Sequence, residues 1–322
     1  MRSERPSPRS PGGGRRFLSL GDVSLSVNEL PHRARRRRAG PPIVMIHGLA
    51  ASSAFWHAAG APFLTLLGPC LAYDLRGHGR SSRPLHGYTV ADMTGDLEAL
   101  LDAQGIDRAH LVAHSFGGSI ALAYALRHPE RVASLVLADV RVRPLQPVVD
   151  VAPKEVPPGV ARRLAACGID PAALPRADDG VDYLRAVARI QMAAGEDAGA
   201  LLNRLYGHGR LFRTAKAARA WIELSDRGSL LEDLKADSPF SAEDLSRIEQ
   251  PMLILVGSRS TTRPSAEGLA QLCPQAILRV VPRVGHFFPI TQPRLFLRPS
   301  IRFLRAVSSS RLQTGSAKPG PG

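Results

Sequence analysis

The chain has 322 residues, of which 44% are hydrophobic and 22% charged. This composition excludes wholesale disorder, and the length is enough for one large domain or two ordinary ones. No stretch approaches the roughly 20 consecutive apolar residues of a membrane-spanning helix, so we expect no spanning segment. The three cysteines, Cys70, Cys167 and Cys273, lie far apart; they exclude a disulfide framework or thiolate zinc site and favour a reducing, cytoplasmic location.

The net charge of +14 is concentrated toward the ends of the chain. Residues 1–38 hold ten arginines against three acids, a net charge of +7. Residues 1–16 mix Pro, Ser, Gly and Arg and are predicted to be a disordered basic tail without a signal peptide, and residues 309–322 a second disordered tail. The run of arginines at 33–38 is interpreted as a solvated connection between strands, so nucleic-acid binding is not expected.

Strand and helix patterns alternate between these tails. Residues 17–20 and 23–30 alternate around a Gly-Asp turn and predict an opening hairpin. Short apolar runs of the kind found in buried parallel strands follow at 43–46, 71–73, 111–113, 135–137, 252–256 and 277–281. Helical patterns lie between them at 54–67, 90–104, 117–127, 265–272 and 293–307. The sequence therefore predicts an α/β fold with a mostly parallel, doubly wound sheet.

One interval, residues 141–247, lacks a convincing strand and contains helical segments at 181–192 and 198–206. We expect it to be a helical cap inserted after the sixth strand, over the carboxyl edge of a core formed by 17–140 and 248–308. Its apolar side chains fit either a pocket wall or ordinary core packing: Tyr183, Leu184, Val187, Ile190, Met192 and Trp221.

The candidate nucleophile is Ser115, in the sequence Leu-Val-Ala-His-Ser-Phe-Gly-Gly-Ser at 111–119. A strand runs directly into a helix there, and the residues two positions before and after the serine are small because strand and helix nearly touch. This is the logic of the nucleophile elbow G-x-S-x-G, with Ala113 in place of the first glycine. The helix N-terminus also supplies N–H groups for developing negative charge.

With this motif the chain resembles the α/β-hydrolase superfamily over roughly residues 17–307, apart from the cap. The other motifs that carry the resemblance are Ile-His-Gly-Leu at 46–49, Asp-Leu-Arg-Gly-His-Gly-Arg-Ser at 74–81 and Arg-Val-Gly-His-Phe-Phe-Pro at 283–289. The resemblance implies that the backbone N–H groups of Leu49 and Phe116 form an oxyanion hole and that His286 is the general base. It implies a structural role for the segment at 74–81. His114 is expected to point elsewhere.

The acid departs from the family pattern. Members of the superfamily usually carry an aspartate three residues after the glycine that ends the seventh strand, and Ser260 occupies that position. Residues 258–264 contain no carboxylate. Asp139 follows the sixth strand, which in the family's sheet order neighbours the nucleophile strand, so it is our candidate for the triad acid. The alternative is that Asp139 only terminates the strand as a polar residue.

These residues predict a serine hydrolase that cleaves a carboxylic ester, thioester or related acyl bond of a small apolar substrate through Ser115, His286 and Asp139. No metal or organic cofactor is expected. An acyltransferase or a haloperoxidase-like enzyme would use the same triad, and a non-catalytic ligand-binding fold is the alternative that Ser260 suggests. Dehalogenase and epoxide hydrolase chemistry are disfavoured because both need an aspartate at the position of Ser115. The pattern leaves the substrate and the oligomeric state open.

Overall fold

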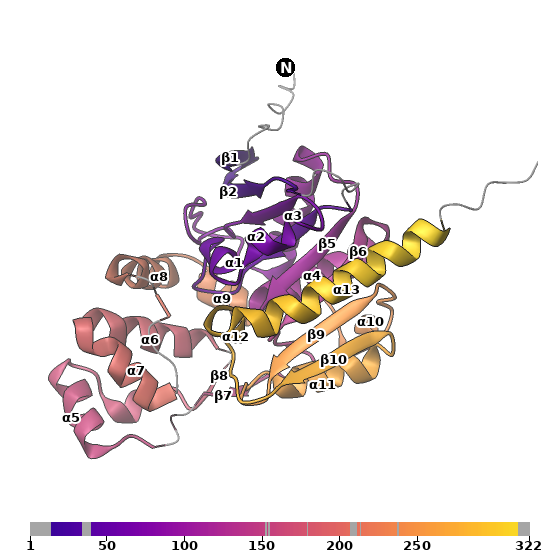
Figure 1. The fold of residues 1–322 in the computed structure, drawn as a ribbon. Coiled ribbons are helices and arrows are strands. Elements are labelled where there is room, and N and C mark those ends of the chain that lie inside the picture. The colour runs from indigo at the N-terminus through magenta and orange to yellow at the C-terminus, as the bar shows by residue number, and fades with distance from the viewer. Residues whose placement is uncertain are drawn as a thin grey trace, which may run out of the picture.

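A computed structural model describes residues 14–33, 40–151, 153, 155–178, 180–206, 211–212, 214–236 and 238–314. An eight-stranded sheet forms its centre, in the order β1-β2-β4-β3-β5-β6-β9-β10 (Figure 1). Strands β1 and β2 and strands β2 and β4 pair antiparallel, and the other neighbours pair parallel. The strands are β1 (Gly14–Leu20), β2 (Val23–Leu30), β3 (Ile43–Ile46), β4 (Cys70–Tyr73), β5 (Ala109–His114), β6 (Val132–Ala138), β9 (Met252–Gly257) and β10 (Ala276–Val281).

Helices cover both faces of the sheet because its central strands are apolar on both sides. In β3, Val44 and Ile46 belong to one buried cluster and Ile43 and Met45 to the other, as the two-residue period of a strand requires. One face carries α3 (Val90–Ala103), α4 (Phe116–Arg127), α10 (Ala242–Leu245) and α11 (Arg263–Leu272). The other carries α1 (Ala54–Ala58), α2 (Ala61–Leu64), α12 (Phe288–Thr291) and α13 (Pro293–Thr314). The predicted fold class is confirmed.

Three expected boundaries are wrong. The first strand begins at Gly14, inside the tail expected to end at residue 16, because Arg16 has partners: its guanidinium lies 2.6 Å from the Glu29 carboxylate and also donates to Gln104. The last helix runs to Thr314 instead of 307, since no Gly or Pro stops it before Gly315. The helix expected at 54–67 is broken at Gly60, whose φ is 89°. The rest of both tails and the arginine run at 34–38 lie outside the described residues.

The segment between β6 and β9 is mostly helical; apart from α10, which packs against the sheet, most of it forms the part of Figure 1 that extends away from the sheet. It contains α5 (Pro158–Ala166), α6 (Val181–Ala193), α7 (Ala198–Tyr206), α8 (Ala215–Arg227) and α9 (Leu230–Lys235). A two-stranded sheet that the pattern did not predict, β7 (Val149–Asp150) with β8 (Ala177–Asp178), lies near its start. Val187, Ile190 and Trp221 are buried in the same apolar cluster as the sheet, with Tyr183, Leu184 and Met192 packed against it, which favours the core interpretation.

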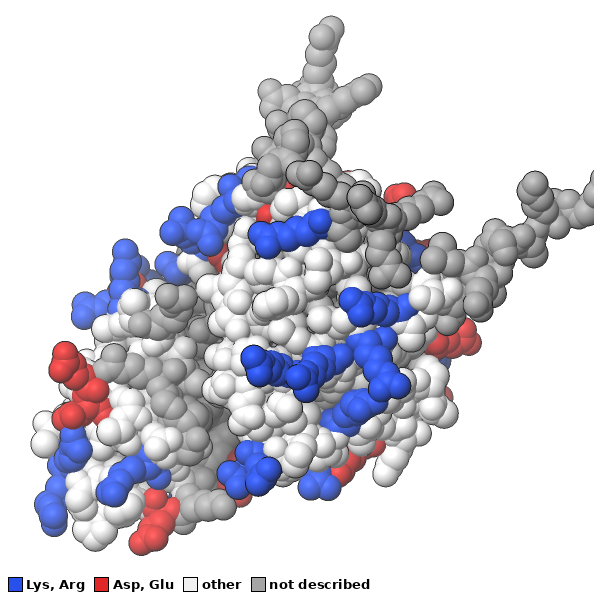
Figure 2. All heavy atoms as spheres, in the orientation of Figure 1, with Lys and Arg blue, Asp and Glu red and all other residues white. Residues whose placement is uncertain are grey.

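The surface in the orientation of Figure 2 is unevenly charged. Lys and Arg side chains gather in a band across the face along which α13 runs, and acidic side chains lie mostly toward the margins of the view. Within the described ranges no helix combines the length and the hydropathy that crossing a bilayer would require.

Candidate active site

Ser115 stands at the sharp turn between β5 and α4, with φ 53° and ψ −127°. Glycines stand two and three positions after it because the helix starts against the neighbouring strands. A Cβ at Gly117 would lie 2.5 Å from the carbonyl oxygen of Ile46, and one at Gly118 would lie 2.3 Å from the side chain of Val140. No side chain fits at either position. The predicted elbow is therefore present in the backbone, with a partly exposed serine at its tip.

The structure brings Ser115, His286 and Asp139 together in one hydrogen-bonded chain. Nε2 of His286 lies 3.1 Å from Oγ of Ser115, and Nδ1 lies 2.8 Å from Oδ1 of Asp139. The Asp139 side chain is fully buried, whereas that of His286 is 26% exposed. Since a carboxylate only accepts, Nδ1 carries the proton and Nε2 is free to accept one from the serine hydroxyl.

Strand register explains why Asp139 reaches this position. Strand β6 lies between β5 and β9, with Ala113 opposite Leu137 and Ala138 opposite Leu255. The three strands run parallel, so the residues that follow them meet at one edge of the sheet. The backbone N–H of Asp139 donates to Leu255 at 2.7 Å and that of Ser115 donates to Ala138 at 3.2 Å. The acid and the serine thus follow adjacent, hydrogen-bonded strands.

Asp139 accepts several further hydrogen bonds from the end of β9. The Ser260 hydroxyl donates to Oδ1, as does that of Thr262 at 2.7 Å, and the Gly257 N–H donates to Oδ2 at 2.8 Å. Burial by itself would raise the pKa of Asp139, but the hydrogen bond from His286 and those from Ser260 and Gly257 outweigh it and lower the pKa to about 2. Asp139 is therefore a carboxylate at neutral pH. Sequence reasoning missed Ser260 and Thr262 as partners of Asp139; the signal was a hydroxyl-rich segment where a carboxylate was expected.

The two residues expected to form the oxyanion hole lie beside Ser115, Leu49 in the loop after β3 and Phe116 at the start of α4. Gly48, just before Leu49, is so close that a Cβ there would lie 2.8 Å from Cβ of Ser115. Phe116 is the first residue of α4, where backbone N–H groups have no partner within the helix. The arrangement puts both peptides next to the serine, and their role toward an oxyanion remains a prediction.

Backbone strain is concentrated in the loops that carry this site. Among the described residues, four that are not glycine have a positive φ: Ala50, Ser115, Asp139 and Arg283, with values between 53° and 60°. Ala50 lies in the loop after β3, and Ser115 and Asp139 directly follow β5 and β6. Arg283 lies in the loop that holds His286. Such conformations each cost on the order of 1–3 kcal/mol and persist where the surroundings enforce them, most often at functional sites.

The expectation that His114 points elsewhere is wrong. Its ring centroid lies 4.8 Å from that of His286 and 4.4 Å from that of Phe55, on which it stacks at 26°. Nε2 of His114 donates to the carbonyl oxygen of His286 at 3.1 Å. Burial, and then the nearby His286, lower the pKa of His114 to about 3, so it is neutral at pH 7. Strand alternation did not reveal this contact because it joins the strand to a loop 172 residues later.

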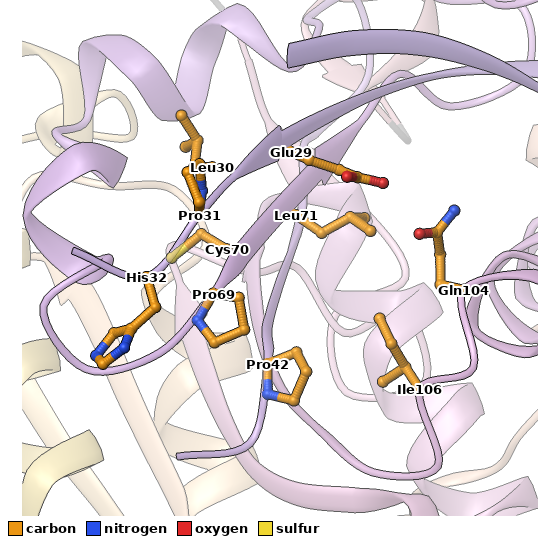
Figure 3. A pocket seen from close by; sticks show the side chains of 10 residues that line it. All are labelled: Glu29, Leu30, Pro31, His32, Pro42, Pro69, Cys70, Leu71, Gln104 and Ile106. Atoms are coloured by element: carbon orange, nitrogen blue, oxygen red, sulfur yellow. The ribbon is translucent and has the colours of Figure 1, made fainter. Parts of the chain in front are cut away.

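A separate shallow pocket lies at the opposite end of the strands (Figure 3). Pro42, Pro69 and Ile106 line it, and these residues precede β3, β4 and β5, whereas Ser115 follows β5. Burial raises the pKa of Cys70, also in its wall, to about 12, so that thiol is not a nucleophile. In the part of the chain that the structure describes, no three His, Cys, Asp or Glu side chains are grouped to hold a metal ion.

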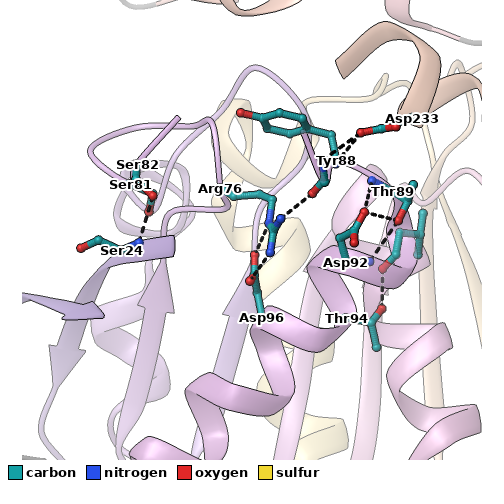
Figure 4. A network of polar contacts seen from close by, with 12 residues as sticks. Ser24, Arg76, Ser81, Ser82, Tyr88, Thr89, Asp92, Thr94, Asp96 and Asp233 are labelled. Atoms are coloured by element: carbon teal, nitrogen blue, oxygen red, sulfur yellow. Dashed lines mark hydrogen bonds and ion pairs between the residues drawn. The ribbon is translucent and has the colours of Figure 1, made fainter. Parts of the chain in front are cut away.

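The segment at 74–81 has the structural role expected of it. Asp74 accepts from the backbone N–H groups of Ser53 and Arg80, at 2.6 and 2.9 Å. Arg76 donates to both carboxylate oxygens of Asp96 at 2.6 Å (Figure 4). These contacts fix the loops that frame the site.

The same region anchors the cap. The Asp233 carboxylate, on α9, accepts from the backbone N–H groups of Gly87 and Tyr88 at 3.1 and 2.8 Å (Figure 4). On α8, Trp221 lies 5.6 Å from the ring of His78, which in turn lies 5.5 Å from that of His47. The cap therefore contacts His78, which in turn packs against His47, the residue before Gly48.

A parallel sheet with a serine elbow, a histidine and a buried carboxylate at one edge defines a hydrolase-type site, and comparison with known proteins agrees. The family model of the alpha/beta hydrolase fold matches residues 41–293. A protein of Caulobacter sp. (strain K31), named "Putative carbamate hydrolase RutD", is 30% identical over 274 residues, which is 81% of this chain and 90% of that protein. The chain belongs to the alpha/beta hydrolase fold family.

Other matches are shorter or more distant. A protein of the same name from Variovorax paradoxus (strain S110) is 42% identical over 106 residues, 33% of this chain and 40% of the relative's length. The crystal structure of the enol-lactonase from Burkholderia xenovorans LB400 superposes with a TM-score of 0.60 at 21% identity, covering 90% of this chain and 100% of that one. At that identity the likeness concerns the fold.

Proposed function

We propose that the protein is a serine hydrolase that cleaves an ester, thioester or related acyl bond of a small apolar molecule. The observation that carries the proposal is the continuous hydrogen-bonded chain from Ser115 through His286 to Asp139. Its distances lie within the range required for a nucleophile, a base and a group that orients the base. The non-catalytic alternative was suggested by Ser260, which stands where a carboxylate was expected. The position of Asp139 beside His286 supports catalysis instead.

The proposed reaction follows the serine–histidine–aspartate template. His286 Nε2 takes the proton of the Ser115 hydroxyl while Oγ attacks the substrate carbonyl carbon. The tetrahedral intermediate collapses, and the proton on Nε2 passes to the leaving oxygen or sulfur. Water, deprotonated by the same nitrogen, then releases the acid and restores the serine. Asp139 holds the proton on Nδ1 throughout and stabilises the imidazolium.

Electrostatics support this division of roles. Asp139 is buried and ionised, with donors on both oxygens, so its charge is directed at Nδ1 and little reorganisation is needed when His286 becomes charged. His114 beside it is neutral and does not repel the imidazolium. The N–H groups of Leu49 and Phe116 are the proposed donors to the oxyanion.

The substrate class is proposed from chemistry. Relatives carry names that refer to carbamate hydrolysis, and a carbamate presents the same carbonyl to a serine as an ester. Of the apolar cap side chains, only the partly buried Tyr183, Leu184 and Met192 are the proposed contacts for a small apolar acyl or alcohol group. The three cysteines are free, which fits the proposed cytoplasmic location.

The test combines covalent labelling with turnover. We expect wild-type protein to react with a fluorophosphonate probe and to hydrolyse members of a panel of aryl esters, thioesters and carbamates of graded chain length. Ser115→Ala and His286→Ala should each lower kcat by about 10³-fold or more. The matched control is Ser119→Ala, one turn along α4, which removes a bond to the Arg141 carbonyl and leaves the elbow in place.

Near-normal turnover by a folded Ser115→Ala variant would contradict the proposal. So would a wild-type protein that stays unlabelled by the probe while its circular dichroism shows a native fold.

A further inference from the structure

Helix α13 presents a row of arginines to solvent. Its inner side is buried through Phe296, Leu297, Ser300, Phe303 and Leu304, in the cluster beneath the sheet. The outer side carries four arginines that are all exposed, with spacings of four, four and three residues that align them along the helix: Arg294, Arg298, Arg302 and Arg305.

No ion pair within the described ranges neutralises this positive charge. Residues 293–314 contain no Asp or Glu, and the ion pairs found among the described residues include none of these four arginines. Arg279 on the edge strand β10 adds to the charge, because it shares the strand face of Val281, which packs in the cluster under α13. Figure 2 shows the resulting band of basic side chains.

Large apolar side chains flank the arginines. On one side, Phe63 and Leu66 are 60% and 45% exposed. They belong to α2 and the turn after it, and α2 packs against α13: a Cβ at Gly60 would meet Leu297 at 2.6 Å and Phe63 at 3.4 Å. On the other side, Ile277 is 48% exposed and shares the strand face of Arg279. We call these three apolar residues and the five arginines the arginine face.

We propose that the arginine face binds the surface of membranes that contain anionic phospholipids. Guanidinium groups pair with lipid phosphates in the headgroup layer, while neighbouring apolar side chains enter the boundary with the acyl chains. The phosphates of a nucleic acid would pair with the arginines. The same phosphate backbone has no apolar surface for Phe63, Leu66 and Ile277 to contact. The combination therefore favours a lipid surface. The proposal involves no residue of the catalytic site and is independent of the proposed hydrolase reaction.

The test is co-sedimentation of the full chain with phosphatidylcholine vesicles, with and without phosphatidylglycerol. We expect binding only to the anionic vesicles, and weaker binding as salt rises. Arg298→Gln/Arg302→Gln/Arg305→Gln should lower the affinity about 100-fold, since each basic residue near such a surface contributes about fivefold at low salt.

The matched control is Arg162→Gln/Arg189→Gln/Arg219→Gln, which removes the same charge from exposed positions on the cap and should retain binding within about twofold. Phe63→Ser/Leu66→Ser, at equal charge, should weaken vesicle binding several-fold and leave binding to a DNA duplex unchanged. Equal losses in the two arginine variants would overturn the proposal, because net charge alone would then explain the binding. Unaltered vesicle binding by the Phe63/Leu66 variant, with the DNA duplex displacing the vesicles, would overturn it in favour of a nucleic-acid surface.

Discussion

The hydroxyl of Ser260 donates a hydrogen bond to Oδ1 of Asp139, the same oxygen that accepts from Nδ1 of His286. Ser260, in the position where members of the superfamily usually carry the acid, therefore donates to a carboxylate that follows the neighbouring strand, β6. Both strand ends still contribute to the orientation of His286, with the charge on β6 and a neutral donor on β9. This arrangement makes the two positions experimentally separable.

Asp139→Asn is expected to lower kcat by about 10⁴-fold, since an amide can favour the wrong tautomer of His286. The amide NH₂ would also face the N–H of Gly257 or the hydroxyls of Ser260 and Thr262, which are all donors. Steady-state kinetics with circular dichroism would check this. If kcat stays within a few-fold of wild type, the acid lies elsewhere or the enzyme works as a Ser–His dyad.

Ser260→Ala should have a much smaller effect, about tenfold or less in kcat, because Thr262 and Gly257 still donate to Asp139. Ser260→Asp should restore part of the activity to Asp139→Asn by supplying the acid from β9. In the wild-type background the same aspartate would face Asp139, and like charges at this distance destabilise the fold. Comparing kcat of the three single variants and the Asp139→Asn/Ser260→Asp double variant measures the coupling between positions 139 and 260. A folded double variant without restored activity would show that a residue after β9 cannot position an acid.

The lowered pKa of Asp139 predicts a pH dependence of stability. The carboxyl group titrates at about 3.9 when unfolded and at about 2 when folded. Its stabilisation, roughly 2 kcal/mol, is therefore fully present above about pH 5 and is lost as the pH falls toward 2. Denaturant unfolding of wild type and Asp139→Asn from neutral to acidic pH should show wild-type stability falling toward that of the variant. A constant difference across this range would mean that the group is not shifted.

His114 is predicted to be a positioning residue for His286. His114→Phe keeps the stacking on Phe55 but removes the donor to the His286 carbonyl, and displacement of the base should lower kcat about 10- to 100-fold. His114→Gln keeps a donor and should retain more activity. KM and the melting temperature should change little in either variant. A loss of kcat that matches the loss of stability in both variants would indicate a purely structural role.

The sequence was sufficient to predict the strands of the eight-stranded sheet and the elbow because those signals are local. Apolar runs such as 252–256 and the small residues around Ser115 are short motifs that can be recognised in the sequence, although the contacts that require Gly117 and Gly118 are made with Ile46 and Val140. The bonds from Ser260 and Thr262 to Asp139, and from His114 to His286, connect segments more than a hundred residues apart. They depend on sheet order, which periodicity does not encode. The extra residues at each end of the fold were missed because Arg16 and the last turns of α13 have no distinctive pattern.

Among the residues that the structure describes, the strand that leads into the His286 loop has a neighbour on one side only. Strands β5 and β6, which deliver Ser115 and Asp139, are each hydrogen-bonded on both sides, whereas β10 is at the edge and pairs with β9 alone. Edge elements fray at lower cost than central ones. On heating, the imidazole should therefore leave the serine and the carboxylate before the centre of the sheet opens, and amide protons of β10 should exchange with solvent ahead of those of β5 and β6. The lifetime of the proposed triad should then be set by local fraying at this edge and be shorter than that of the fold.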